Sequence, residues 1–89
     1  MKAVVTVIGK DKKGIIANVS AVLSQNGANI LDISQTVLEN FFAMIMLVDL
    51  SDVSLPFTEL KERLETAGKE IGLDIRIQRE EIFDAMHRV

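Results

Sequence analysis

The most constraining feature of the sequence is the order in which two kinds of hydrophobic spacing follow one another. Residues 2–8 alternate with the period of two that is typical of a strand, and residues 15–25 carry apolar side chains at helical spacing. A β region from residue 29 to about 50 follows, then a second helical pattern over residues 57–71 and an alternating run over residues 73–78. The predicted order is therefore strand, helix, strand, strand, helix, strand.

Two successive strand–helix–strand units with right-handed crossovers predict an α+β fold, the ferredoxin-like βαββαβ sandwich. Its antiparallel sheet has four strands, the first and third central and the second and fourth at the edges, with both helices on one face. We expect a single domain over residues 1–89. A short closing helix is predicted over residues 80–89 from apolar side chains at helical spacing: Ile82, Phe83, Met86 and Val89.

The connections carry recognisable turn and cap residues. A turn is expected from Gly9 to Gly14, and the carboxylate of Asp11 is suited to cap the first helix, which Gly27 would end. Residues 39–40 are the predicted hairpin turn between the second and third strands. Pro56 suits the first turn of the second helix.

The strand over residues 41–50 is apolar on both of its faces. A sheet open to water on one side alternates apolar with polar residues, so something covers the second face: the tail helix, another subunit, or both. The chain contains no cysteine, and its hydrophobic fraction of 48% is high for 89 residues. Because a small domain without disulfides usually needs further burial, we predict a homo-oligomer.

The composition argues against several classes of function. The net charge of −3 disfavours nucleic acid as a partner, and no apolar run is long enough to span a membrane. No signal peptide is apparent, so a cytoplasmic location is expected. His87, the single histidine, lies in the tail, and without cysteine no Cys–His pair can form, so no catalytic residue is predicted. No metal site or cofactor is predicted either, since the aspartates do not have the spacing of a calcium loop.

The turn before the first helix is the candidate binding site. Gly14 permits close approach to the backbone, and the free amides of Gly14, Ile15 and Ile16 at a helix N-terminus suit a carboxylate. From these residues alone, a tight turn with no ligand is an equally good interpretation.

A longer pattern surrounds this turn. An acidic residue precedes a Gly-led helix, and an Asn–Ile pair opens the second strand: Asp11 to Ala17, Val19, Leu23, Gly27, Asn29 and Ile30. The pattern resembles the ACT domain, a regulatory amino-acid-binding module of many metabolic enzymes. Residues 32–36 and 82–86 resemble the stand-alone, UPF0237-like single-ACT proteins, which are related to the regulator of the glycine cleavage system.

The resemblance implies a non-catalytic sensor whose ligand lies between two subunits of a side-by-side dimer. Asp11 matches the side chain that meets the amino group of an amino acid, and Asn29 matches an asparagine that reaches in from the other chain. Gly14, Ile15 and Ile16 match the backbone contacts. A dimer or a tetramer, an amino-acid ligand and a regulated protein partner are the expected interactions.

Three alternatives remain open from the sequence. Gly9 stands where some amino-acid-binding members of the family have a side chain that contacts the ligand, and Lys13 replaces a proline that often precedes the glycine of the turn. Both departures favour an interaction module that has lost its ligand. RNA binding on the open sheet would use Phe41 and Phe42 as stacking platforms. An acylphosphatase-like enzyme would need an arginine in the loop after the first strand, and that loop has lysines but no arginine.

Overall fold

The structure, a computed structural model, describes residues 1–86 and confirms the predicted order of elements. The elements are β1 (Lys2–Lys10), α1 (Ile15–Gln25), β2 (Asn29–Leu38), β3 (Phe41–Asp49), α2 (Phe57–Ile71), β4 (Leu73–Arg79) and α3 (Glu80–Met86). The strands form one antiparallel sheet of four strands in the order β2–β3–β1–β4, which is the ferredoxin-like arrangement. His87, which the sequence places in the tail, lies outside the described residues.

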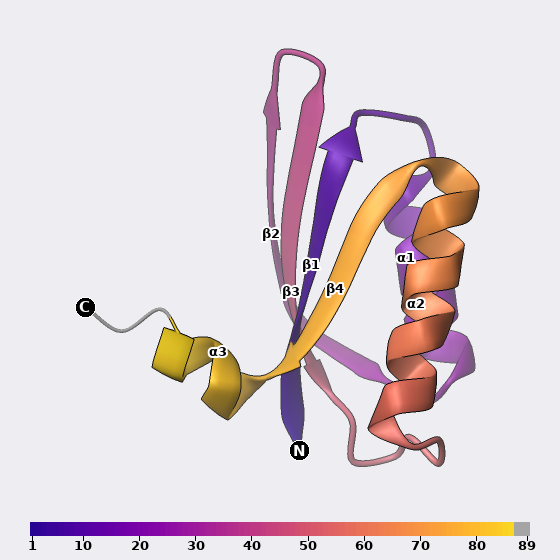
Figure 1. Cartoon of the computed structure of the whole chain (residues 1–89), viewed down its shortest axis with the longest axis vertical. Helices are drawn as coiled ribbons and strands as arrows, with labels where there is room; N and C mark the ends of the chain where they lie inside the picture. The colour runs from indigo at the N-terminus through magenta and orange to yellow at the C-terminus, as the bar shows by residue number, and fades with distance from the viewer. Residues whose placement is uncertain (87–89) are drawn as a thin grey trace.

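The molecule has a sheet with α1 and α2 on one face and α3 on the other (Figure 1). The hydrophobic core lies between the sheet and the two long helices. Its fully buried larger side chains are Val5, Val7, Val19, Leu23, Met44, Met46, Val48, Leu60 and Leu64. We call the other side of the sheet, where α3 lies, the open face.

The apolar side chains of β3 point alternately to the core and to the open face. Phe42 is 4% exposed in the core, whereas its neighbour Phe41 is 59% exposed on the open face. The hypothesis that both phenylalanines form a stacking platform for RNA is therefore wrong, because successive residues of a strand point to opposite sides of the sheet.

The turn after β1 is shorter than the sequence predicts. Gly9 and Lys10 belong to β1, since they pair with β3 opposite Phe42 and Phe41. Asp11 does not cap α1, contrary to the prediction. The N-cap residue is Gly14, whose left-handed backbone (φ 82°) reverses the chain, and no side chain bonds to the first amides of the helix.

The other turns agree with the sequence, with one shift. Gly27 follows the end of α1 with φ 87°, and residues 39–40 form the hairpin turn between β2 and β3. Pro56 is the N-cap residue of α2 rather than a residue of its first turn.

Glu39 carries the strain of the hairpin turn, because it has φ 54°, whereas Asn40 does not have a positive φ. Glu39→Gly is expected to raise the free energy of unfolding by about 1 kcal/mol, since a left-handed residue with a Cβ costs roughly 1–2 kcal/mol. Urea unfolding at equal protein concentration measures the change. Asn40→Gly is the control and is expected to give no gain; a loss of stability in Glu39→Gly would contradict the strain.

Candidate functional site

The turn between β1 and α1 presents unused backbone amides. Gly14 places the chain so that α1 begins at Ile15 with neither a capping side chain nor an acidic residue in its first turn. The side chain of Asn18 donates to the carbonyl oxygen of Gly14 at 2.9 Å, which fixes the turn without covering the amides. Because the first amides of a helix have no partner within it, this end of α1 can accept an anionic group.

Two hydrogen bonds anchor the turn to distant parts of the chain. The amide of Asp11 donates to the carbonyl oxygen of Asn40 at 2.7 Å, which joins the turn to the tip of the β2–β3 hairpin. The ammonium group of Lys12 donates to the carbonyl oxygen of Ile71 at 2.9 Å, at the end of α2. The turn is therefore held from both sides.

A hollow of about 250 Å³ lies between this turn and the edge strand β2. The structure brings four of the five predicted site residues to it: Asp11, Gly14, Ile15 and Ile16. Its wall also includes Gln35 and Val37 from β2 and Phe42 from β3. The hollow therefore combines a carboxylate and free amides from the turn with an apolar wall, and β2 forms one of its sides.

Asn29, the fifth predicted residue, is not at this hollow within one chain. It begins β2, whereas Gln35 lies six residues further along the strand, or about 20 Å away. Asn29 faces Asp49 in the β2–β3 ladder. The hydroxyl and the amide of Ser51 donate to Asp49 at 2.6 and 2.9 Å, which lowers the pKa of that carboxyl and keeps it ionised beside Asn29.

The edge strand β2 is exposed along almost its whole length, although it contains apolar residues. Ile33 and Val37, on the same side of the sheet as the hollow, are 39% and 54% exposed. The strand has ten residues and neither lysine nor proline, and Asp32 is its single charge. Edge strands of soluble proteins usually carry such blocking residues, so β2 has the properties of a strand that pairs with another chain.

Gly9 has a structural explanation. A Cβ at this position would overlap the side chain of Leu73, the residue that pairs with Gly9 across β1 and β4. Leu73 thus fills the space that a side chain at position 9 would occupy.

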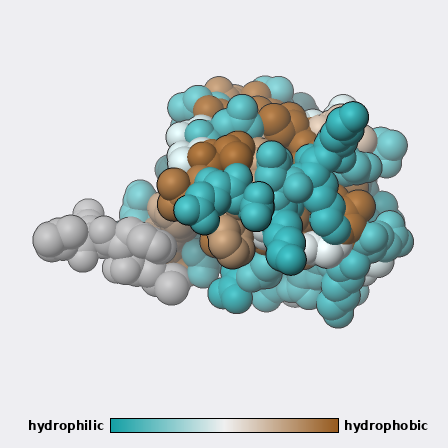
Figure 2. All heavy atoms as spheres, turned by 90° about the horizontal axis from the view of Figure 1, so that it is seen from above, coloured by the Kyte–Doolittle hydropathy of each residue, from teal (hydrophilic) through white to brown (hydrophobic). Residues whose placement is uncertain are grey.

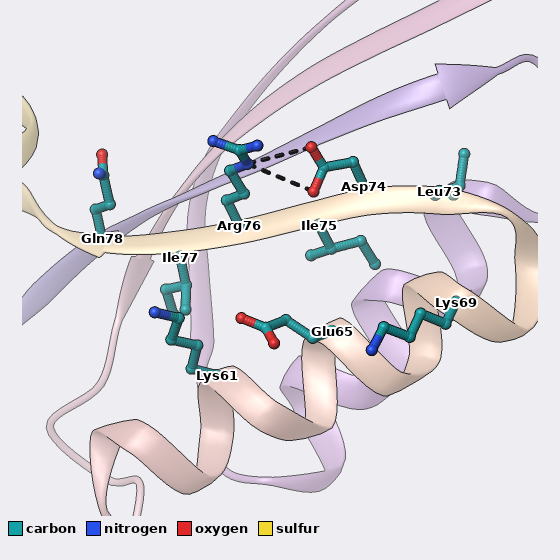
Figure 3. A pocket seen from close by; sticks show the side chains of 9 residues that line it. All are labelled: Lys61, Glu65, Lys69, Leu73, Asp74, Ile75, Arg76, Ile77 and Gln78. Atoms are coloured by element: carbon teal, nitrogen blue, oxygen red, sulfur yellow. Dashed lines mark hydrogen bonds and ion pairs between the residues drawn. The ribbon is translucent and has the colours of Figure 1, made fainter.

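A larger hollow of about 470 Å³ lies along the free edge of β4 (Figure 3). Lys61, Glu65 and Lys69 reach from α2 toward the strand, while Arg76 and Asp74 pair at 3.1 Å on its other side. The rest of the lining is mainly apolar, from Leu73, Ile75 and Ile77 of β4. Within residues 1–86, no three metal-ligating side chains of His, Cys, Asp or Glu form a cluster, and no helix is long and apolar enough to cross a membrane.

Comparison with known proteins agrees with this geometry. A family model described as "ACT domain" matches residues 2–78, which includes the turn, α1 and all four strands up to Gln78. The chain belongs to the ACT domain family.

Two of the similar proteins match this chain over nearly their whole length, and a third matches it with less than half of its own length. A UPF0237 protein of Methanocaldococcus jannaschii is 54% identical over 88 residues, which cover 99% of this chain and 98% of that protein. The solved ACT domain protein from Streptococcus pneumoniae has a TM-score of 0.83 and 47% identity, with 98% of each chain covered. A putative glycine cleavage system transcriptional repressor has a TM-score of 0.74 and 26% identity over 88% of this ACT domain and 44% of that chain.

Sequence reasoning missed the part of the site that β2 and β3 contribute to this ACT domain. Gln35, Val37 and Phe42 are far from the turn in sequence, and only the pairing of the strands brings them to it. One signal was available: Gln35 is a polar residue between Ile33 and Val37 on the side of β2 that faces the helices.

Proposed function

We propose that this ACT domain is a non-catalytic sensor that binds a free amino acid in the hollow between the α1 turn and β2. The observation that carries the proposal is the set of uncapped amides at Gly14 to Ile16, which share a hollow with the carboxylate of Asp11. An α-amino acid has the matching groups: its carboxylate accepts from the amides, and its ammonium group pairs with Asp11.

A second copy of the chain completes the site in this proposal. If β2 pairs antiparallel with its own copy about a twofold axis at Ile33, the first residues of the partner subunit's β2 lie at the end of β2 that borders the hollow. The β-bulge between Ile30 and Asp32 shifts the register beyond the axis, so Asn29 of the partner subunit lies at this end of the strand but not directly opposite Val37. The exposed apolar edge of β2 supports this pairing. Each ligand then touches both chains, so binding strengthens the dimer, and the dimer strengthens binding to the same degree.

Scanning calorimetry with single amino acids tests the sensor. A ligand at one hundred times its Kd adds about 2.7 kcal/mol to stability, which raises the melting temperature by about 15 °C in a domain of this size. The matched controls are the corresponding amine without the carboxylate and the acid without the amino group, which are expected to have no effect. If no amino acid raises the melting temperature at millimolar concentration, the sensor function is wrong.

Asp11→Asn is expected to weaken amino-acid binding about tenfold or more, since the ammonium group of the ligand loses its opposite charge. Calorimetric titration measures the Kd. Asp52→Asn makes the same change at an exposed position outside the lining of the hollow and is expected to leave the Kd unchanged. Equal affinities of the two variants for the amino acid would show that Asp11 does not contact the ligand.

The second candidate function is an interaction module that regulates a partner protein without a ligand. Gly9 favours it, because the family resemblance places a ligand-contacting side chain of some members at this position, and here Leu73 occupies that space. An Asp11→Ala variant that still regulates the partner, together with unchanged melting in all amino acids, would support this function over the sensor.

A further inference from the structure

The sheet has a second free edge at β4. In the strand order β2–β3–β1–β4, this strand pairs with β1 on one side, and no strand of residues 1–86 pairs with its other side. The hollow of about 470 Å³ lies along this edge, between α2 and residues 73–78, and we call it the β4 groove. Extended peptides bind to other proteins by adding a strand to such an edge. In the β2 pair proposed above, β4 remains the outer edge of the joined sheet, so the groove stays accessible.

Three charges of alternating sign line the helix side of the β4 groove. Lys61, Glu65 and Lys69 follow one another at intervals of four residues on α2 and point toward β4 (Figure 3). None of them forms an ion pair within residues 1–86. Four residues of a helix span about 6 Å, and alternate side chains of a strand are about 6.8 Å apart. A strand in the groove therefore places three of its side chains opposite these three charges.

The floor of the β4 groove is apolar but already buried. Leu73, Ile75 and Ile77 are 6%, 2% and 3% exposed. Figure 2 looks onto the end of the molecule where α2 passes into β4 and shows hydrophilic side chains that project between hydrophobic patches. A strand that docks along β4 gains little apolar burial, so main-chain hydrogen bonds supply its affinity and the charges select its sequence.

The same charges oppose a second copy of the chain in the groove. A twofold axis at the middle of β4 sets Lys61 opposite Lys69 of the second copy, and Glu65 opposite its own equivalent. An axis one residue further along sets Arg76 against Arg76, and an axis one residue earlier sets Asp74 against Asp74. Since like charges directly opposite each other destabilise strand pairing, the groove favours a different chain.

We propose that the β4 groove binds an extended segment of a different protein, which adds to β4 as a fifth strand. The side chains of this segment that face α2 are acidic, basic and acidic in turn, opposite Lys61, Glu65 and Lys69. This pattern reads the same in both directions, so a parallel and an antiparallel strand both satisfy it. On the open face Asp74 and Arg76 pair with each other at 3.1 Å, so that side of β4 adds no net charge. The inference goes beyond the proposed function and does not depend on amino-acid binding.

A synthetic peptide tests the groove without knowledge of the natural partner. The peptide Thr-Glu-Val-Lys-Val-Glu-Thr, with a fluorescent label, has the length of β4 and the required order of charges. The peptide Thr-Lys-Val-Glu-Val-Lys-Thr reverses each charge. Fluorescence anisotropy measures both affinities, and the first peptide is expected to bind about tenfold more tightly, because three opposite-charge pairs become three like-charge pairs in the second.

A charge-reversed variant of the protein is the decisive partner in this experiment. Lys61→Glu with Glu65→Lys and Lys69→Glu is expected to prefer the second peptide, a reversal that damage to the fold cannot produce. All three side chains are exposed and lie outside the lining of the hollow at the α1 turn, so the response to amino acids is expected to stay unchanged. Glu62→Lys with Glu70→Lys changes charges of α2 outside the groove and is expected to keep the preference for the first peptide.

Hydrogen exchange locates the bound peptide. The amides of β4 that point away from β1 are expected to exchange more slowly with the first peptide present, whereas those of β2 are unaffected. Slower exchange in β2 alone would place the peptide at the other edge and overturn the inference. Equal affinities for the two peptides, an unreversed preference in the charge-reversed variant, or no binding at millimolar peptide would overturn it as well. A reversed preference in a protein that binds no amino acid supports the groove while the sensor function fails.

Discussion

Ile33→Lys is expected to convert the protein into single chains of 9.9 kDa and to remove amino-acid binding at the same time. In the proposed β2 pair Ile33 lies on the twofold axis, so the variant sets two lysines against each other at the centre of the interface. Lysine on an edge strand also opposes pairing in general. Sedimentation measures the mass, and calorimetry measures binding.

The fold itself is expected to survive this change, since Ile33 is 39% exposed. Thr66→Lys, which adds the same charge on the exposed side of α2, is the matched control and is expected to keep both assembly and binding. If the Ile33→Lys variant remains assembled, the chains associate through a surface other than β2. Single chains that still bind the amino acid with unchanged affinity would show that Asn29 of a partner takes no part in the site.

Gly68→Val is expected to lower the free energy of unfolding by about 3 kcal/mol, the upper end of the usual cost of overfilling a core. Gly68 is buried in α2 where the helix meets β4. A Cβ at this position would lie 2.7 Å from the backbone oxygen of Leu73 and 3.0 Å from Cγ1 of Ile75. Because a strand backbone cannot move aside as a flexible side chain can, the helix itself must shift. Urea unfolding monitored by circular dichroism measures the loss.

Two further variants separate crowding from helix propensity. Thr66→Val places the same side chain on the exposed surface of α2 and is expected to change stability by a few tenths of a kcal/mol. Gly68→Ala adds only the Cβ and gains about 1 kcal/mol of helix propensity, so its net loss is expected to be smaller. If Gly68→Val is as stable as the wild-type protein, the close approach of α2 to β4 is wrong.

The sequence predicts the order of elements, the central and edge strands, and the position of both long helices on one face, because hydrophobic periodicity reports burial directly. It does not explain Gly68. A glycine inside a helix is unfavourable by itself, and its reason, the backbone of Leu73, lies across a contact that the helical pattern does not contain.

The candidate site shows the same division. The turn from Asp11 to Ile16 can be found from local sequence, since its residues are consecutive. Gln35 and Val37 reach the hollow only through the register of β2 on β3. The wrong prediction for Asp11 has a related cause: capping propensity favours aspartate, but the left-handed Gly14 starts the helix three residues later.

The hydrogen bond from the Asp11 amide to Asn40 has a practical consequence. This proton exchanges with deuterium only when the turn and the hairpin tip separate, so its exchange rate reports how often this corner of the molecule opens. The Lys12 side chain holds the other flank of the turn against the end of α2. Because Asp11 also lines the hollow, a bound compound is expected to slow this exchange, so the exchange rate of one backbone proton reports binding even when the compound has not been identified.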